Sequence, residues 1–408
     1  MKHYLISFVK IKKILIMVLS KILPVIFITL SFSSCKKSHN HDEDVVAEFQ
    51  KTFGGPENDF GNSIVVSADQ QLFCFGTTSS LTNGGKDFYL IKTTTSGNLI
   101  YEKHFGGSGD ETGYSVMNSP DGGIVMAGST TGSGSGNFDM YVVKAGLQGS
   151  VVYEKFYGTA DDETATCIIA TGNSGYLIGG FRSAAGSGRD FYLVRTDQAG
   201  NEMWSKTYGG AADDFINSLA YVVNAQQEDE FLVFGNTRSH GAGDQDFYLM
   251  KINASGDSLW GKTYGTASYE QAGSIIQDAG GFYLCGHSAG HGHAEHNVYL
   301  VRTDLSGNMI WENNYGGALH DGSEQGLLAS NGDILMTGYS SSYGAGDVDF
   351  MLMRVKTGGQ LVSTRVFGSL NENVAFSIAE TGDAYYMTGY EKSGPGNKSN
   401  LMLAKVKK

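Results

Sequence analysis

One stretch of this sequence decides its fold: Phe105-Gly106-Gly107-Ser108-Gly109-Asp110-Glu111-Thr112-Gly113-Tyr114-Ser115-Val116. Its opening, an aromatic residue followed by glycine, recurs at Phe53, Phe105, Tyr157, Tyr208, Tyr264, Tyr315 and Phe367. These marks are separated by 52, 52, 51, 56, 51 and 52 residues. A period of about 50 residues matches the length of one four-stranded blade of a β-propeller.

Each copy of the repeat contains four strand-like runs separated by glycine-rich turns. In the second copy the runs are Tyr114–Met117, Gly123–Ala127, Asp139–Lys144 and Val151–Phe156. The second and third runs are almost continuously apolar, which indicates a sheet covered on both faces by neighbouring sheets. We therefore predict an all-β protein, a seven-bladed β-propeller of four-stranded blades.

The two ends of the repeat region predict how the ring closes. The seventh copy stops after its third strand, Leu401–Lys405, and lacks an outermost strand. The segment Val45–Phe53 matches Leu99–Phe105, the outermost strand of another copy, in register. We predict that the N-terminal strand completes the last blade, so that residues 45–408 form a closed ring without exposed sheet edges.

The first 34 residues indicate an export signal. Lysines come first, the apolar stretch Ile22–Phe32 follows, and Cys35 comes directly after two serines. This segment resembles the signal peptide and lipobox of bacterial lipoproteins. The resemblance implies that residues 1–34 are removed, that Cys35 is the lipid attachment site, and that residues 35–44 are a polar linker. A plain transmembrane anchor is the alternative.

Composition narrows the choice of compartment and partners. The lipoprotein resemblance implies a lipid-anchored protein of the bacterial cell envelope, at the outer membrane, and we expect a monomer. The formal net charge of −13 repels phosphate backbones, so we do not expect a nucleic-acid partner. Cys74, Cys167 and Cys285 stand in apolar runs and are expected to be small buried hydrophobic residues.

Comparison of the seven copies, position by position, reveals an acidic column. The sixth residue after the mark is acidic in six copies: Asp59, Glu111, Glu163, Asp214, Glu270 and Asp321. Because this position leads into the innermost strand, we expect these carboxylates to ring one mouth of the central channel. There they would bind a cation such as Ca²⁺ or a basic ligand. The alternative is that each acid caps turn amides within its own blade.

Two further columns flank the third strand. An Asp or Asn begins it, and we expect these residues to fix turns: Asp87, Asp139, Asp190, Asp246, Asn297, Asp349 and Asn400. A basic residue ends it, and we expect these side chains to reach solvent or a local carbonyl: Lys92, Lys144, Arg195, Lys251, Arg302, Arg354 and Lys405. Neither column by itself predicts a ligand.

Histidines cluster in one loop of the fifth copy, where four of the ten fall between positions 287 and 296. We consider His291, His293 and His296, with His320 from the adjacent copy, as candidate ligands for Zn²⁺. Their spacing matches no standard zinc signature. The alternative is a solvent-exposed polar loop.

The stretch Phe105–Val116, continued by Asp121–Gly123 and Ala127–Thr130, resembles the seven-bladed β-propeller repeat of bacterial surface and secreted proteins. The resemblance implies the fold of residues 45–408, but propellers host many functions. We expect a binding or scaffold module for a glycan, peptide or protein partner. A hydrolase or lyase that acts on polysaccharide through the carboxylates or a metal is the alternative, and whether the protein is an enzyme is left open.

Overall fold

The computed structural model describes residues 47–80, 82, 84–172, 175–184, 188–292, 295–393, 396 and 398–408. The predicted signal peptide, Cys35 and the linker lie outside these residues, as do Val45 and Val46 at the start of the predicted closing strand. No helix within the described ranges is long and apolar enough to cross a membrane.

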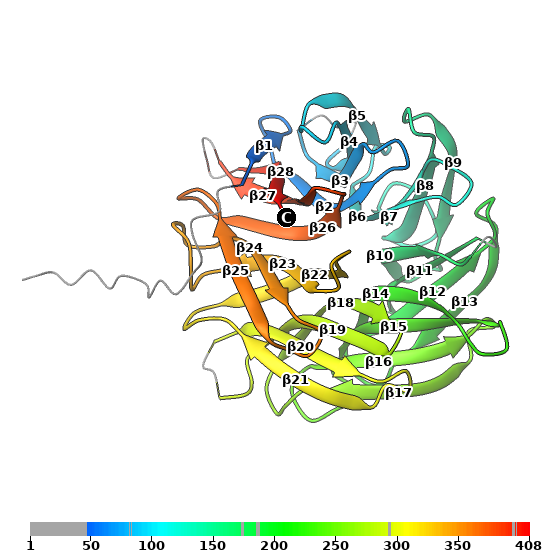
Figure 1. The fold of residues 1–408 in the computed structure, drawn as a ribbon. Coiled ribbons are helices and arrows are strands. Elements are labelled where there is room, and N and C mark those ends of the chain that lie inside the picture. The colour runs from blue at the N-terminus through cyan, green and yellow to red at the C-terminus, as the bar shows by residue number, and fades with distance from the viewer. Residues whose placement is uncertain are drawn as a thin grey trace, which may run out of the picture. The chain divides into compact units, whose positions relative to one another are not determined.

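The described residues form seven four-stranded antiparallel sheets, the blades, arranged around a centre (Figure 1). The innermost strands are β2 (Asp59–Val66), β6 (Glu111–Asn118), β10 (Asp162–Ala170), β14 (Asp214–Val223), β18 (Glu270–Asp278), β22 (Asp321–Leu328) and β26 (Asn373–Glu380). The second strands are β3 (Leu72–Thr78), β7 (Ile124–Thr130), β11 (Tyr176–Ser183), β15 (Asp229–Thr237), β19 (Gly281–Ser288), β23 (Ile334–Ser340) and β27 (Ala384–Lys392).

The outer half of each blade follows in chain order, except in the last blade. The third strands are β4 (Asp87–Thr93), β8 (Asp139–Ala145), β12 (Arg189–Thr196), β16 (Asp246–Asn253), β20 (Asn297–Thr303), β24 (Asp349–Val355) and β28 (Ser399–Lys407). The outermost strands are β5 (Leu99–Phe105), β9 (Val151–Tyr157), β13 (Glu202–Tyr208), β17 (Ser258–Tyr264), β21 (Met309–Tyr315), β25 (Leu361–Phe367) and β1 (Phe49–Phe53). The predicted seven-bladed fold is confirmed.

The first and last parts of the propeller meet in one sheet, with strand order β1-β28-β27-β26. β1 pairs antiparallel with β28, so that Phe49 lies opposite Lys405 and Phe53 lies opposite Leu401. The predicted completion of the last blade by the N-terminal strand is therefore confirmed for Phe49–Phe53. Since each blade then has its outermost strand, the ring closes.

The hydrophobic core is divided among the interfaces between neighbouring blades. Between the first and second blades, for example, Phe88 and Leu90 of β4 pack with Met126 of β7 and Val143 of β8. The third strands are buried along their length because blades cover both of their faces, whereas outermost strands such as β5 are largely exposed. Cys74, Cys167 and Cys285 are free thiols in this core, as predicted.

The two faces of the propeller carry different loops. We call upper face the side on which the innermost strands begin, where loops enter each blade and join its second and third strands. We call lower face the opposite side, where turns join the first to the second strand and the third to the fourth. This division follows from the antiparallel order of the strands.

Candidate functional site: the central channel and its upper mouth

The six acidic residues predicted to ring the channel mouth begin or lie near the start of the innermost strands, on the upper face, but they are buried. None of Asp59, Glu111, Glu163, Asp214, Glu270 and Asp321 is more than 2 % exposed. Each accepts a hydrogen bond from the backbone N–H four residues before it, as Glu270 does from Thr266 at 3.1 Å. Glu270 also accepts the hydroxyl hydrogens of Thr266 and Ser288, at 2.9 and 2.8 Å.

These bonds give every carboxylate of the column a place in the loop that enters its own blade. A cation or basic ligand would therefore compete with amide and hydroxyl donors for the same oxygens. Burial raises the pKa of Glu111 and Glu163, since water no longer solvates the charged form. Binding of Ca²⁺ or a basic ligand at this column stays a prediction.

The histidine loop does not bring its candidate ligands together as expected. The His291 ring lies against Tyr299, with centroids 4.9 Å apart, and its Nε2 is 3.3 Å from Oε1 of Glu312 on the outermost strand β21. His296 lies instead beside His320, with ring centroids 5.2 Å apart. His293 lies outside the described residues. Among the residues that are described, no group of three or more His, Cys, Asp or Glu side chains is placed to hold a metal ion.

A third histidine, which the sequence analysis did not select, joins His296 and His320. The His287 ring is 5.2 Å from that of His296 and 6.1 Å from that of Tyr339. It is 8 % exposed, and burial together with the neighbouring His296 and His320 lowers its pKa to about 3. His287 ends an apolar strand, so nothing in its local sequence distinguishes it from a core residue. His287 therefore contributes a neutral imidazole to the upper mouth.

The central channel is lined by an irregular feature of the innermost strands. In every blade the pairing of the first and second strands skips one residue, which leaves a β-bulge. The skipped residues are Asn62, Tyr114, Thr166, Asn217, Gly273, Glu324 and Phe376, and all of them line a cavity of about 320 Å³. Bulges re-aim side chains and are frequent next to functional sites.

The bulge column was missed because its members share no residue type. All seven are the ninth residue after the aromatic mark, so the repeat alignment could have located them. The available signal was that the residue type at this position varies from copy to copy within an otherwise regular repeat. Glu324 is the acidic member of this ring.

The polar side chains of the bulge column differ in whether they form hydrogen bonds to neighbouring strands. The Asn62 amide donates to the carbonyl of Gly113 at 2.6 Å, the Thr166 hydroxyl donates to Ile216 at 2.6 Å, and Asn217 accepts from the Asn236 amide at 2.6 Å. These three side chains are therefore engaged with neighbouring strands. The pKa of Glu324, by contrast, responds to burial alone.

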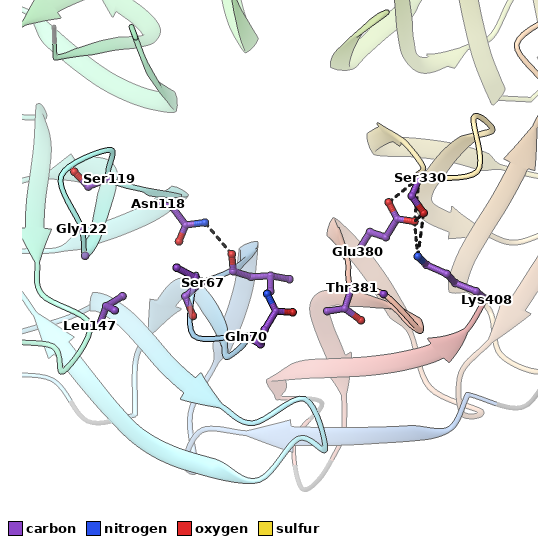
Figure 2. A pocket seen from close by; sticks show the side chains of 14 residues that line it. Ser67, Gln70, Asn118, Ser119, Gly122, Leu147, Ser330, Glu380, Thr381 and Lys408 are labelled. Atoms are coloured by element: carbon purple, nitrogen blue, oxygen red, sulfur yellow. Dashed lines mark hydrogen bonds and ion pairs between the residues drawn. The ribbon is translucent and has the colours of Figure 1, made fainter. Parts of the chain in front are cut away.

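The lower face holds a second, wider depression of about 690 Å³ (Figure 2). Turns between first and second strands line it, and at its edge the carboxylate of Glu380 contacts both Ser330 and Lys408. These contacts engage the side chains of Ser330, Glu380 and Lys408 with one another. The lower depression is thus lined by turns and by the Glu380–Lys408 ion pair, whereas Glu324 and the histidines lie in the channel and its upper mouth.

The basic column on the lower face meets carbonyl oxygens, as expected, and acids in addition. Arg195 donates to the carbonyls of Tyr176 and Thr196, and Lys92 donates to that of Leu147. Most members of the column also form ion pairs with acids of adjacent turns or strands. Examples are Lys92 with Asp69 at 3.0 Å and Arg302 with Asp278 at 2.8 Å. The partners are far from the column in sequence, but the hairpin of the first two strands brings them to the end of the third strand.

Comparison with known proteins supports the fold. A scan against protein-family models and a search of curated proteins give no match. Among solved structures, the chain is similar to the WD40 β-propeller domain of Doa1, with a TM-score of 0.51, 11 % identity, and coverage of 88 % of this chain and 95 % of that chain.

Two further solved structures score slightly lower. Sqt1 from Chaetomium thermophilum gives a TM-score of 0.49 and 10 % identity over 90 % of this chain and 100 % of that chain. The polysaccharide lyase Uly1 gives 0.48 and 11 % over 87 % and 91 %. At these identities the likeness shows the propeller fold alone. The resemblance to the repeat of bacterial surface and secreted proteins stays a prediction.

Proposed function

We propose that this protein is a lipid-anchored binding module of the bacterial cell envelope whose upper face binds a glycan. One observation carries the proposal: aromatic and imidazole rings interrupt the repeat at the channel mouth, on the last three blades and, with Phe181, on the third. At equivalent upper positions of the second strands, the residues are Thr77, Ser129, Phe181, Asn236, His287, Tyr339 and Tyr390.

The rings form two groups on the last three blades and the first. In one group Tyr269 and His296 have centroids 5.5 Å apart, and His287 lies between His296 and Tyr339. In the other, Tyr390 contacts Phe60 at 5.3 Å and Phe376 at 5.7 Å. We call the two groups together the upper rings. Apart from His287, these rings are partly exposed.

This combination suits sugars. Sugar rings have apolar C–H faces that pack on aromatic rings, and hydroxyls that need hydrogen-bonding partners at their edges. Ligand sites commonly combine aromatic walls with a few placed polar groups. The upper rings supply the walls, while the Tyr269 hydroxyl, the imidazole of His296 and the Glu324 carboxylate supply polar groups. The acidic net charge favours a neutral or basic glycan over an acidic one.

The path of the chain is consistent with an anchor on the opposite side. The chain leads into β1 from the lower face, where the Glu48 N–H donates to the Lys405 carbonyl at 2.7 Å. Eleven residues lie between Cys35 and Ala47, which is an extended reach of roughly 40 Å. A lipid on Cys35 would thus be joined to the chain that enters β1 at the lower face.

The test uses the full-length protein, expressed in a bacterium and purified in detergent. Mass spectrometry of the N-terminal peptide should show a lipid on Cys35, and Cys35→Ser should release the protein from membranes. On a glycan array the protein should retain neutral or basic glycans. Tyr339→Ala should lose them, whereas Tyr221→Ala, in an innermost strand away from the upper mouth, should retain them.

The same experiment separates the proposal from its competitors. Capture of peptides or proteins with a blank array would overturn the glycan proposal. Release of shorter or unsaturated sugars from the retained glycans would move the protein into the hydrolase or lyase class. Retention of glycans by Tyr339→Ala at wild-type strength would remove the upper rings from the site.

A further inference from the structure

Glu324 is placed unusually for a carboxylate. It is the bulge residue of β22, skipped between the pairs Ser323–Gly338 and Gln325–Thr337. It lines the central cavity, whose wall is contributed by the innermost strands of all seven blades. The bulge turns a position that regular pairing would bury into one that faces the channel.

Among the described residues, no lysine or arginine pairs with this carboxylate. Burial is the cause of its altered acidity and raises its pKa to about 7, and no lysine, arginine or hydrogen-bond donor of the described chain contributes. An ionised carboxylate in such a place is costly unless a positive group pairs with it. On the lower face, by contrast, the turn acid Asp333 has basic partners in Arg354 and Lys356.

The cavity that Glu324 lines leaves room for such a group. Its neighbour in the ring on one side is Gly273, which has no side chain and where a Cβ atom would come within 2.7 Å of the carbonyl oxygens of Ser323 and Glu324. Its neighbour on the other side is Phe376. A cation beside an aromatic ring gains from the ring's negative face as well as from the carboxylate.

We propose that the central channel holds a primary ammonium group, paired with Glu324, and that this group is the free amine of an amino sugar in the glycan bound by the upper rings. The inference rests on the proposed glycan function and names its substrate class. The cavity volume of about 320 Å³ lies at the small end of ligand sites, which suits one sugar residue. An ammonium donates three hydrogen bonds, so it can use the carboxylate and nearby carbonyl oxygens together.

The pKa values of the groups around Glu324 allow the pairing of Glu324 with an ammonium group to be followed by its pH dependence. The titratable side chains that interact electrostatically with Glu324 are Tyr269, Tyr339, Tyr390 and Cys285, and burial raises the pKa of each. The pKa of His287 and that of His296, in the upper mouth, are lowered by burial. Between pH 6 and 8 the three tyrosines and Cys285 therefore stay protonated and His287 stays neutral, while Glu324 ionises.

Calorimetric titration of the full-length protein in detergent tests the proposal, with glucosamine, N-acetylglucosamine and glucose at pH 7. Glucosamine should bind most tightly, and Glu324→Gln should weaken it about 30-fold, the loss expected for removing one partner of an enclosed charge pair. Asp244→Asn is the matched control, because it removes an exposed acid of the upper face that contacts only Arg238 at 3.8 Å. It should bind glucosamine like the wild type.

Cadaverine, a diamine without a sugar, supplies the pH profile because alkyl ammonium groups stay charged to about pH 9. Its binding should strengthen from pH 6 to 8 in the wild type and stay constant in Glu324→Gln. Equal binding of the three sugars, or unchanged glucosamine binding by Glu324→Gln, would overturn the channel site. Tighter binding of cadaverine than of glucosamine would overturn the amino-sugar assignment.

Failure of the glycan function gives a different pattern. A blank array together with Glu324-dependent glucosamine binding would reject the upper rings as a glycan site and leave the channel site standing. Retention of neutral glycans on the array, together with unchanged glucosamine binding by Glu324→Gln, would keep the upper rings as a glycan site and reject the channel site.

Discussion

Asp246 of β16 and Glu270 of β18 point their carboxyl groups at the same glycine, Gly265, across the interface between the fourth and fifth blades. A Cβ atom at Gly265 would collide with both carboxyl groups, so the close approach requires glycine. Two columns that the sequence shows separately thus meet between blades. The pairing recurs with two acids at Gly106 and Gly158, whereas at Gly316 an amide, Asn297, faces the acid Asp321.

The Asn297–Asp321 pair at Gly316 shows that an amide can stand in place of one of the two acids. It therefore predicts the effect of Asp246→Asn. Burial raises the pKa of Asp246, and Glu270 raises it further, so the folded protein holds a proton that the unfolded chain releases at lower pH. Stability from this group is therefore present at low pH and lost as the pH rises through the raised pKa. We expect Asp246→Asn to stabilise the protein by about 1 kcal/mol at pH 8 and by less at pH 4.

Thermal unfolding of both proteins at the two pH values measures this difference. The reverse substitution, Asn297→Asp, places a second acid beside Asp321 and should destabilise at pH 8 more than at pH 4. Identical pH dependence of wild type and variants would show that the paired acids do not share this linkage.

The buried His287 predicts a pH dependence of opposite sign. Burial lowers its pKa to about 3, so it stays neutral in the folded protein while the unfolded chain takes up a proton below about pH 6.5. Its contribution falls with decreasing pH by at most about 1.4 kcal/mol per pH unit. We expect His287→Phe to gain stability relative to the wild type between pH 7 and 4, measured by denaturant unfolding. An NMR titration showing protonation of His287 near pH 6.5 would contradict this.

Ring closure through β1 predicts that the N-terminal strand is essential for cooperative unfolding. Deletion of Val45–Phe53 exposes the edge of β28 and should give a broad transition at lower temperature. The milder variant Thr52→Pro, opposite Met402 in this edge strand, should lower the unfolding temperature less than the deletion does. Calorimetry compares both with a deletion of residues 36–44, which should unfold like the parent. A sharp transition at the parent's temperature after removal of Val45–Phe53 would exclude the closure role.

The placement of the histidines predicts which of them any zinc affinity depends on. His296 lies beside His320 and has a buried Nδ1 without a partner, whereas His291 faces Glu312. We expect His296→Ala to weaken zinc binding about tenfold and His291→Ala to leave it unchanged, since loss of one ligand has effects of this order. Titration with Zn²⁺ alone measures both. Equal, weak binding by wild type and both variants would rule out a histidine metal site.

How much the sequence reveals differs between the scaffold and the site. The period of the aromatic–glycine marks and the match of Val45–Phe53 to an outer strand sufficed for the blade number and the closure. The apolar third strands predicted burial between blades. These features are local or periodic. Because each copy repeats the same evidence, a departure in one copy does not change the predicted fold.

The candidate site was less accessible to such reasoning. The acidic column was visible, but its burial and turn bonds depend on how each loop folds back onto its blade. His291 and His296 are five residues apart, yet His291 lies against Tyr299 and Glu312 whereas His296 lies beside His320.

What the sequence determined by itself is the architecture: seven similar wedges, each with four strands, and an N-terminal strand that completes the last. What only the tertiary structure decided is which side chains meet at the centre. Glu324 faces the channel because a bulge breaks the two-residue alternation of β22, and His287 meets Tyr339 because adjacent blades bring distant segments side by side. Such contacts depend on strand register and blade packing, which no local pattern encodes.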